Sequence, residues 1–210
     1  MIAGHGDGDS GAVGNGYNEA DLTREVASII PEFLSAYANV TVGDTNRDWF
    51  KWLKNHSFDF KPYDYVLEIH FNSGAGDLKG DGIITGTEIY VTKSEKAITV
   101  EEDILEQMSE IGFTSRGVKR KNFSVISKVK AQGVSSALLE VAFIDDKDDM
   151  ELYQLKKYSV AWAVSRGISE GFNLISKEEL TLTQYEELKD RINNLEDKVK
   201  DAEMIYNYID

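Results

Sequence analysis

Two histidines and one glutamate of this chain have the types and positions that hydrolytic metal chemistry requires. His5 lies in the glycine-rich opening segment "AGHGDGDSGAVGNGYNEADL", where Glu19 begins the first amphipathic stretch, and His70 lies near the end of the apolar run "YDYVLEIHFNS". In open α/β sheets, ligand sites gather at the carboxyl ends of strands, and both histidines fit that position. Two imidazoles and a carboxylate are typical ligands of a catalytic zinc ion.

Each of these residues also has an ordinary structural interpretation. A histidine at a strand end is often a capping or core residue, and Glu19 in a first helical turn interacts favourably with the helix dipole. The third histidine, His56, lies in a polar linker. The chain has no cysteine, which excludes disulfides and thiolate catalysis and leaves histidine and carboxylate as the metal ligands. Spacing alone leaves the metal site and the structural interpretation both open.

Glu140 is a second candidate for proton-transfer chemistry. It lies in the apolar segment "SSALLEVAFIDD", where burial of an unpaired carboxylate would be costly. Either it has a partner, or it lies at a strand end facing a cleft, or it points outward from an edge strand. Partial burial raises the pKa of a carboxyl toward the range that a general base needs.

Composition limits the class of protein. With 210 residues and 41% hydrophobic content, the chain has room for one globular domain and a modest appendage. A net charge of -14 argues against a general nucleic-acid binder, which needs clustered lysine and arginine. We find no signal peptide and no apolar run of about 18 residues, so we expect synthesis in the cytoplasm and no membrane insertion.

The chain alternates predicted strands and helices. Apolar residues at helical spacing begin after Asn18, and Pro31 is expected to kink or split this helix. We predict strands over 40–42, 63–73, 86–92, 123–127 and 137–142, and helices around 49–53, 93–111 and 147–171. This order indicates an α/β domain over residues 1–172, with a twisted, mostly parallel sheet flanked by helices.

The C-terminal segment differs in kind. After a linker over residues 173–179, apolar residues follow a heptad pattern within residues 180–210, among them Tyr185, Leu188, Ile192, Leu195 and Val199. Charges at the flanking positions form attractive pairs across two such helices, as for Arg191 and Glu196. We predict a coiled-coil helix that forms a homodimer or acts as a spacer. The alternative is a helix that folds back on its own domain.

Several segments together resemble the zinc-dependent type 3 family of N-acetylmuramoyl-L-alanine amidases. The opening segment is similar to the family's His-Gly turn and helix-opening glutamate, and "LEIHFNSG" resembles its second histidine segment. "GTEIYV", "RGVKRKNFSVI" and "ALLEVAFIDDKDDM" resemble its later segments, in the same order. Only three residues precede Gly4, so we expect either that the first strand of the family is short here or that the natural chain begins earlier.

The resemblance implies that His5, Glu19 and His70 hold Zn²⁺ and that Glu140 is the catalytic acid/base. It implies bacterial peptidoglycan as the substrate, cut at the amide between N-acetylmuramic acid and L-alanine. Asn72 and Arg116 are candidates for substrate binding, although a turn-capping role suits Asn72 equally well. We expect a phage endolysin that acts on the host cell wall. The alternatives are a cellular autolysin of the same activity and a non-catalytic peptidoglycan-binding protein.

A calcium-loop pattern is set aside. "DLKGDGIITGTE" places Gly82 at the sixth and Glu88 at the twelfth position of such a loop. Lys79, however, puts an ammonium group where a ligand oxygen belongs, and the residues that follow are predicted to form a strand.

Overall fold

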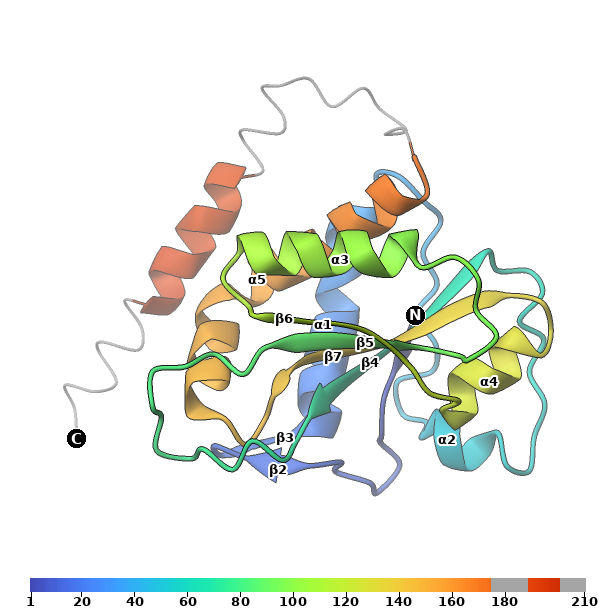
Figure 1. Cartoon of the computed structure of the whole chain (residues 1–210), viewed down its shortest axis with the longest axis horizontal. Coiled ribbons are helices and arrows are strands. Elements are labelled where there is room, and N and C mark those ends of the chain that lie inside the picture. Colours follow the sequence, from blue (N-terminus) through green and yellow to red (C-terminus); the bar gives the residue numbers. More distant parts are fainter. Residues whose placement is uncertain (175–188, 201–210) are drawn as a thin grey trace.

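A five-stranded sheet forms the centre of the molecule (Figure 1). The computed structural model describes residues 1–174 and 189–200. The strands lie in the order β1, β4, β7, β5, β6. Their bounds are β1 Ile2–Ala3, β4 Tyr65–Asn72, β5 Thr87–Val91, β6 Ser115–Arg120 and β7 Ser135–Phe143. Neighbouring strands are parallel except β5 and β7, which pair antiparallel, so the predicted mostly parallel sheet is confirmed.

Helices cover both faces of the sheet. The helices α1 (Glu19–Leu34), α3 (Thr99–Glu110) and α5 (Lys147–Gly171) pack on one face, and the short α2 (Trp49–Trp52) and α4 (Ser124–Lys130) pack on the other. In Figure 1, α3 lies above the strands, and α4 and α2 lie below them. Each face has its own apolar cluster. No helix in the described ranges combines the length and apolar character that crossing a bilayer requires.

The glycine-rich opening segment contains regular structure. It contains a short hairpin of β2 (Val13–Gly14) and β3 (Tyr17–Asn18), which leads directly into α1. The side chain of Asn18 accepts a hydrogen bond from the backbone N–H of Asp21 and so caps α1, as its type predicts. The predicted break at Pro31 is wrong: α1 continues to Leu34. Pro31 lies in the last turn, where its missing N–H removes only one helical hydrogen bond.

The prediction of a strand over 123–127 is wrong, because this segment opens α4. The strand of this region lies earlier, as β6. Val125, Ile126 and Val129 of α4 are buried, and Val125 and Val129 belong to the apolar cluster on this face of the sheet. A short apolar run fits a strand and a buried helix equally well, and the packing partner decides between them.

Two other predicted elements also differ. Residues 40–42 form no strand. Gly43 donates to the carbonyl of Met1 and the amino terminus of Met1 donates to the carbonyl of Thr41, but no ladder develops. The helix predicted from residue 93 begins at Thr99, after a loop in which Asn122 accepts the N–H of Lys93. The long final helix is present, with non-helical backbone angles at Lys156.

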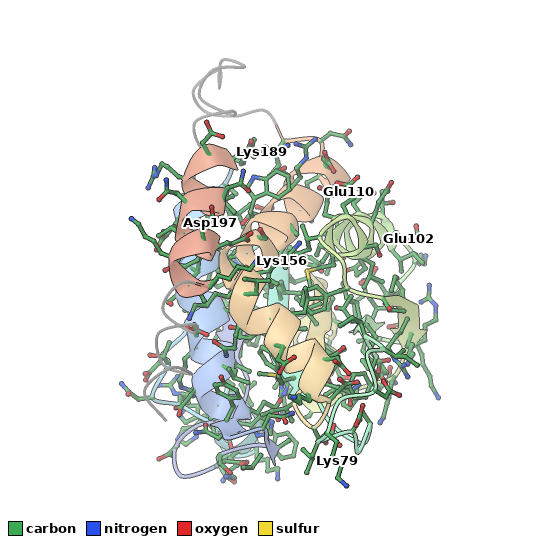
Figure 2. All side chains as sticks on the ribbon, turned by 90° about the vertical axis from the view of Figure 1, so that its left-hand side faces the viewer. Lys79, Glu102, Glu110, Lys156, Lys189 and Asp197 are labelled. Atoms are coloured by element: carbon green, nitrogen blue, oxygen red, sulfur yellow. The ribbon has the colours of Figure 1, made fainter. Side chains whose placement is uncertain are left out.

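Part of the C-terminal segment is described, as a helix over residues 189–200. In Figures 1 and 2 it lies beside α5, with Lys189 and Asp197 labelled on it and Lys156 on α5. Ser159 donates a hydrogen bond to Glu196, and Ile192 is buried. A contact between this helix and α5 is what the alternative prediction, a helix folded back on its own domain, requires. The rest of the predicted coiled coil and most of the linker lie outside the described residues, so the dimer stays a prediction.

Candidate metal centre and active site

His5 and His70 come together because β1 and β4 are parallel neighbours. Ala3 of β1 pairs with Ile69 of β4, which brings the segment after β1 to the carboxyl end of β4. Gly4 is required at this crossing, because a Cβ atom there would lie 2.4 Å from Cε1 of His70. His5 itself has a φ of 59°, a left-handed conformation that non-glycine residues adopt rarely.

Glu19 joins the two imidazoles. Its Oε1 lies 2.8 Å from Nδ1 of His70, and its Oε2 lies 3.1 Å from Nε2 of His5. The hairpin β2–β3 returns the chain to this point, and Gly11, shortly before the hairpin, is required there. A Cβ atom at Gly11 would lie 2.6 Å from Oε2 of Glu19. The sequence prediction that these three residues form one cluster agrees with this geometry.

The three side chains fit a zinc ion by the chemistry of their donors. One ligand atom from each of His5, Glu19 and His70 lies within 4.8 Å of the others. Two imidazole nitrogens and one carboxylate oxygen are the ligand set of catalytic zinc sites that keep a fourth position open. The group is half-buried to buried, so a cation here would replace contacts that the side chains now make with one another.

Two further carboxylates face the outer nitrogens of the imidazoles. Oδ1 of Asp9 lies 3.5 Å from Nδ1 of His5, and Oε1 of Glu68 lies 3.3 Å from Nε2 of His70. A histidine that binds a metal through one nitrogen commonly donates its other N–H to a carboxylate, which orients the ring. The sequence analysis missed both residues. For Glu68 a signal exists, because residues two apart in a strand share one face.

The charges of this cluster shift the pKa values of its members. Burial acts to raise the pKa of Glu19, but hydrogen bonds from His5 and His70 outweigh it and lower that pKa strongly. The hydrogen bond to Glu19 raises the pKa of His5 against the effect of burial. For His70, burial acts to lower the pKa, and the carboxylates of Glu19 and Glu68 overcome it and raise the pKa well above its ordinary value.

Glu140 lies beside this cluster on β7. It is the register partner of His70 on β4, so its side chain lies on the same face of the sheet. Within the described part of the chain, its Oε2 atom is buried and has no hydrogen-bond partner. Burial raises the pKa of Glu140 to about 7, and the nearby carboxylates of Glu19, Glu88 and Glu68 add to the increase against the effect of His70. The sequence left open whether Glu140 has a partner, faces a cleft or points outward from an edge strand, and the structure places it facing a cleft.

A cleft of about 250 Å³ opens onto these groups. Its floor includes Gly4, His5, Glu68, His70 and Glu140, and its walls include Trp49 and Phe50 of α2 and Phe123 at the start of α4. The cleft is therefore bounded by the two helices that cover this face of the sheet.

The two residues predicted to bind substrate lie beside Glu140, around Glu88. Asn72 donates to Oε1 of Glu88 at 2.9 Å and caps its own turn by accepting the N–H of Ser73. Arg116 donates from Nε to Oε2 of Glu88 at 2.7 Å. Lys119 also donates to Glu88. The sequence analysis considered Glu88 only as a position of the calcium-loop pattern, and it missed Lys119.

The remaining sequence candidates lie elsewhere. His56 stacks on the ring of Trp52, with 4.6 Å between the ring centroids. Glu88, the twelfth position of the calcium-loop pattern, lies in β5 and pairs with Arg116 and Lys119, which does not fit a calcium loop. Asp77, Asp81 and Asp148 lie close together, and the carboxylates of Asp77 and Asp148 accept backbone hydrogen bonds of the surrounding loop.

Comparison with known proteins identifies the family. Residues 1–170 match the type 3 family of N-acetylmuramoyl-L-alanine amidases. The chain belongs to this family. The amidase CwlM of Bacillus licheniformis is 29% identical over 180 residues, which cover 81% of this chain and 67% of CwlM. The endolysin of Bacillus phage SPP1 is 29% identical over 178 residues, covering 81% of this chain and 63% of the endolysin.

Two further comparisons concern a longer relative, which the chain matches over part of its length, and a solved structure with the same fold. The chain is 29% identical to the probable autolysin PH of Staphylococcus aureus over 175 residues, which cover 72% of this chain but only 34% of that protein. The catalytic domain of the amidase CwlV from Bacillus (Paenibacillus) polymyxa has the same fold. Its TM-score is 0.63 at 22% identity, with 82% of this chain and 97% of that domain covered.

Proposed function

We propose that this amidase-family chain is a zinc-dependent hydrolase that cuts peptidoglycan at the amide between N-acetylmuramic acid and L-alanine. The observation that carries the proposal is the arrangement of four side chains. His5, Glu19 and His70 offer a zinc ligand set, and Glu140 lies beside them with a buried, unpartnered oxygen. The match of residues 1–170 to the family supplies the bond that is cut.

The side chains divide the chemistry between them. A zinc ion held by His5, Glu19 and His70 would lower the pKa of a bound water to about 7 and polarise a carbonyl group. Glu140 accepts the proton of the attacking water and returns it to the departing alanine nitrogen. Asp9 and Glu68 hold the two imidazoles in orientation through their outer nitrogens. Asn72 and Arg116, beside Glu140, contact the substrate.

Digestion of purified cell walls tests the bond and the metal together. The chain is incubated with walls, with and without a chelator, and the masses of the released fragments are measured. We expect stem peptides with a free alanine amino terminus, no release with chelator, and recovery when zinc is added back. Release of muramyl-peptides with that amide intact would refute the proposal, and binding to walls without cleavage would favour the non-catalytic alternative.

We further propose that the protein is a phage endolysin, which the likeness to the SPP1 endolysin supports. The likeness to a probable autolysin keeps the cellular alternative. Expression in a bacterial host, with and without a separate pore-forming protein, separates the two. An endolysin that depends on membrane lesions lyses cells only when the pore is present, whereas lysis without it would favour the autolysin.

We also propose that residues 1–172 form the catalytic domain and that residues 180–210 serve as a dimerisation helix or spacer. The heptad pattern supports the dimer, while the bond from Ser159 to Glu196 supports the folded-back alternative. Light scattering of the full chain gives the mass directly. A monomer mass at micromolar concentration would dismiss the dimer.

A further inference from the structure

Glu88 gathers donors from several strands at one buried point. Only 2% of its surface is exposed. Its Oε1 accepts hydrogen bonds from Asn72 at 2.9 Å and from the hydroxyl of Tyr90 at 2.6 Å, and its Oε2 accepts from Nε of Arg116 at 2.7 Å and from Lys119. These contacts fix the two cationic side chains beside each other on the active face of the sheet.

The two cations exceed the charge that holds them. Glu88 supplies one negative charge, whereas Arg116 and Lys119 supply two positive charges. Their side chains are 38% and 37% exposed, so both reach solvent from this buried anchor. Among the described residues, the only other hydrogen bond of either side chain is a long one of 3.4 Å, from Nη1 of Arg116 to the carbonyl of Thr85. Hydrogen-bonding capacity and positive charge therefore remain for an anion.

The position of this pair relative to Glu140 suits a peptide that leaves the site. Glu88 and Glu140 are register partners on β5 and β7, so their strands lie about 4.8 Å apart. The cationic groups of Arg116 and Lys119 contact Glu88, whose side chain lies on the same face of the sheet as that of Glu140, one strand away. A departing nitrogen must lie within hydrogen-bond reach of Glu140, and an extended chain advances about 3.3–3.6 Å per residue. The second residue of the departing peptide therefore lies near the cations.

We propose that Arg116 and Lys119, positioned by Glu88, form a subsite for a free carboxylate on the second residue of the stem peptide. The inference rests on the proposed function, because it takes the leaving nitrogen to be that of the first residue. An arginine and a lysine bind a carboxylate through charge-assisted hydrogen bonds that its neutral amide cannot match. The subsite thus distinguishes a stem peptide with D-glutamate at its second position from one with the amide, D-isoglutamine.

Two small substrates test the subsite directly. They are N-acetylmuramoyl-L-alanyl-γ-D-glutamyl-L-lysine and its D-isoglutamine counterpart, in which the peptide bond to lysine takes up the γ-carboxyl so that only the α-carboxylate differs. Both are cleaved by the zinc-loaded full chain. Hydrogen bonds to a charged group contribute enough to favour the acid by about 10- to 100-fold in kcat/KM. In Lys119→Met and Arg116→Gln, we expect KM to rise much more for the acid than for the amide, so the preference collapses.

Matched variants separate recognition from folding. Lys119→Arg keeps the positive charge and should keep the preference, whereas Lys61→Met removes an exposed lysine from another part of the surface and should change neither substrate. Thermal unfolding of each variant shows whether the fold persists. If Lys119→Met does not fold, the original chain's preference and its weakening by added salt still decide the question.

The outcomes also separate the subsite from the proposed function. Equal cleavage of acid and amide by the original chain would overturn the subsite and leave the amidase proposal standing. An acid preference that survives in both Lys119→Met and Arg116→Gln would overturn the assignment to these residues. Cleavage of neither substrate, together with intact cell walls, would overturn the proposed function and the subsite with it.

Discussion

Glu140 and Glu88 lie directly opposite each other on neighbouring antiparallel strands, yet their surroundings differ completely. Glu140 has a buried oxygen without a partner among the described residues, and burial raises its pKa to about 7. Glu88 is also buried, and burial acts on its pKa in the same direction. Hydrogen bonds from Lys119, Tyr90 and Arg116 outweigh that effect and lower the pKa of Glu88.

The comparison teaches that the donors around a carboxylate decide its role. A buried carboxylate without donors has a raised pKa, so it both binds and releases a proton near neutral pH, as a general acid or base needs. A carboxylate saturated by donors stays charged and holds its donors in place. On our proposal, the same residue type serves as a proton carrier on β7 and as an anchor on β5.

The largest expected effect comes from Glu140→Gln. Glutamine keeps the shape of the side chain but cannot take the proton, so kcat should fall on the order of 10²- to 10⁴-fold. Zinc content and the thermal unfolding temperature should stay close to those of the original chain. Steady-state kinetics, metal analysis and calorimetry check this. Turnover within tenfold of the original chain would remove Glu140 from the acid/base role.

The opposite glutamate should respond differently. Glu88→Gln leaves Arg116 and Lys119 without their anchoring charge, and the free energy of unfolding should fall by about 1–3 kcal/mol. The exposure of both cations limits the loss, because they can turn toward water. Denaturant unfolding measures it. If Glu88→Gln instead removed turnover as completely as Glu140→Gln without loss of stability, the contrast between the two residues would fail.

Glu68 offers a third case, a carboxylate that acts through a histidine. Glu68→Gln weakens the contact with Nε2 of His70, and zinc affinity should fall about 10- to 100-fold. Competition with a chelator measures the affinity without relying on activity. Glu106→Gln, at an exposed position on α3, is the matched control and should bind zinc as the original chain does. Unchanged affinity in Glu68→Gln would show that Glu68 does not support the metal site.

The pH profile gives the smallest effect and sharpens the comparison. Glu140 accepts a proton only when it is deprotonated, so kcat/KM should fall as the pH is lowered through its pKa. The value of about 7 is the upper limit for this acid limb, because a bound cation favours the charged carboxylate. The negative charge of Glu88 raises the pKa of Glu140, so Glu88→Gln should move the acid limb of the pH profile to lower pH. A move to higher pH would contradict the assignment.

The sequence predicted much of the fold and the centre of the site. The alternation of strands and helices predicted a mostly parallel sheet, and the segments around His5, Glu19 and His70 predicted one cluster, as the structure has it. The prediction failed for residues 123–127, where a short apolar run is compatible with either a strand or a helix. It also missed the anchoring role of Glu88, whose local sequence shows an ordinary strand residue.

The sequence by itself determined the donor types and the glycines that allow them to meet. Gly4 and Gly11 leave room for His70 and Glu19, a requirement set by the size of these residues. Only the tertiary structure decided which glutamate stands alone and which is saturated. That choice depends on β5 lying antiparallel to β7 and parallel to β6, which brings Arg116 and Lys119 to Glu88 and leaves Glu140 without them. Strand pairing between distant segments is set by packing of the whole sheet, so no local pattern records it.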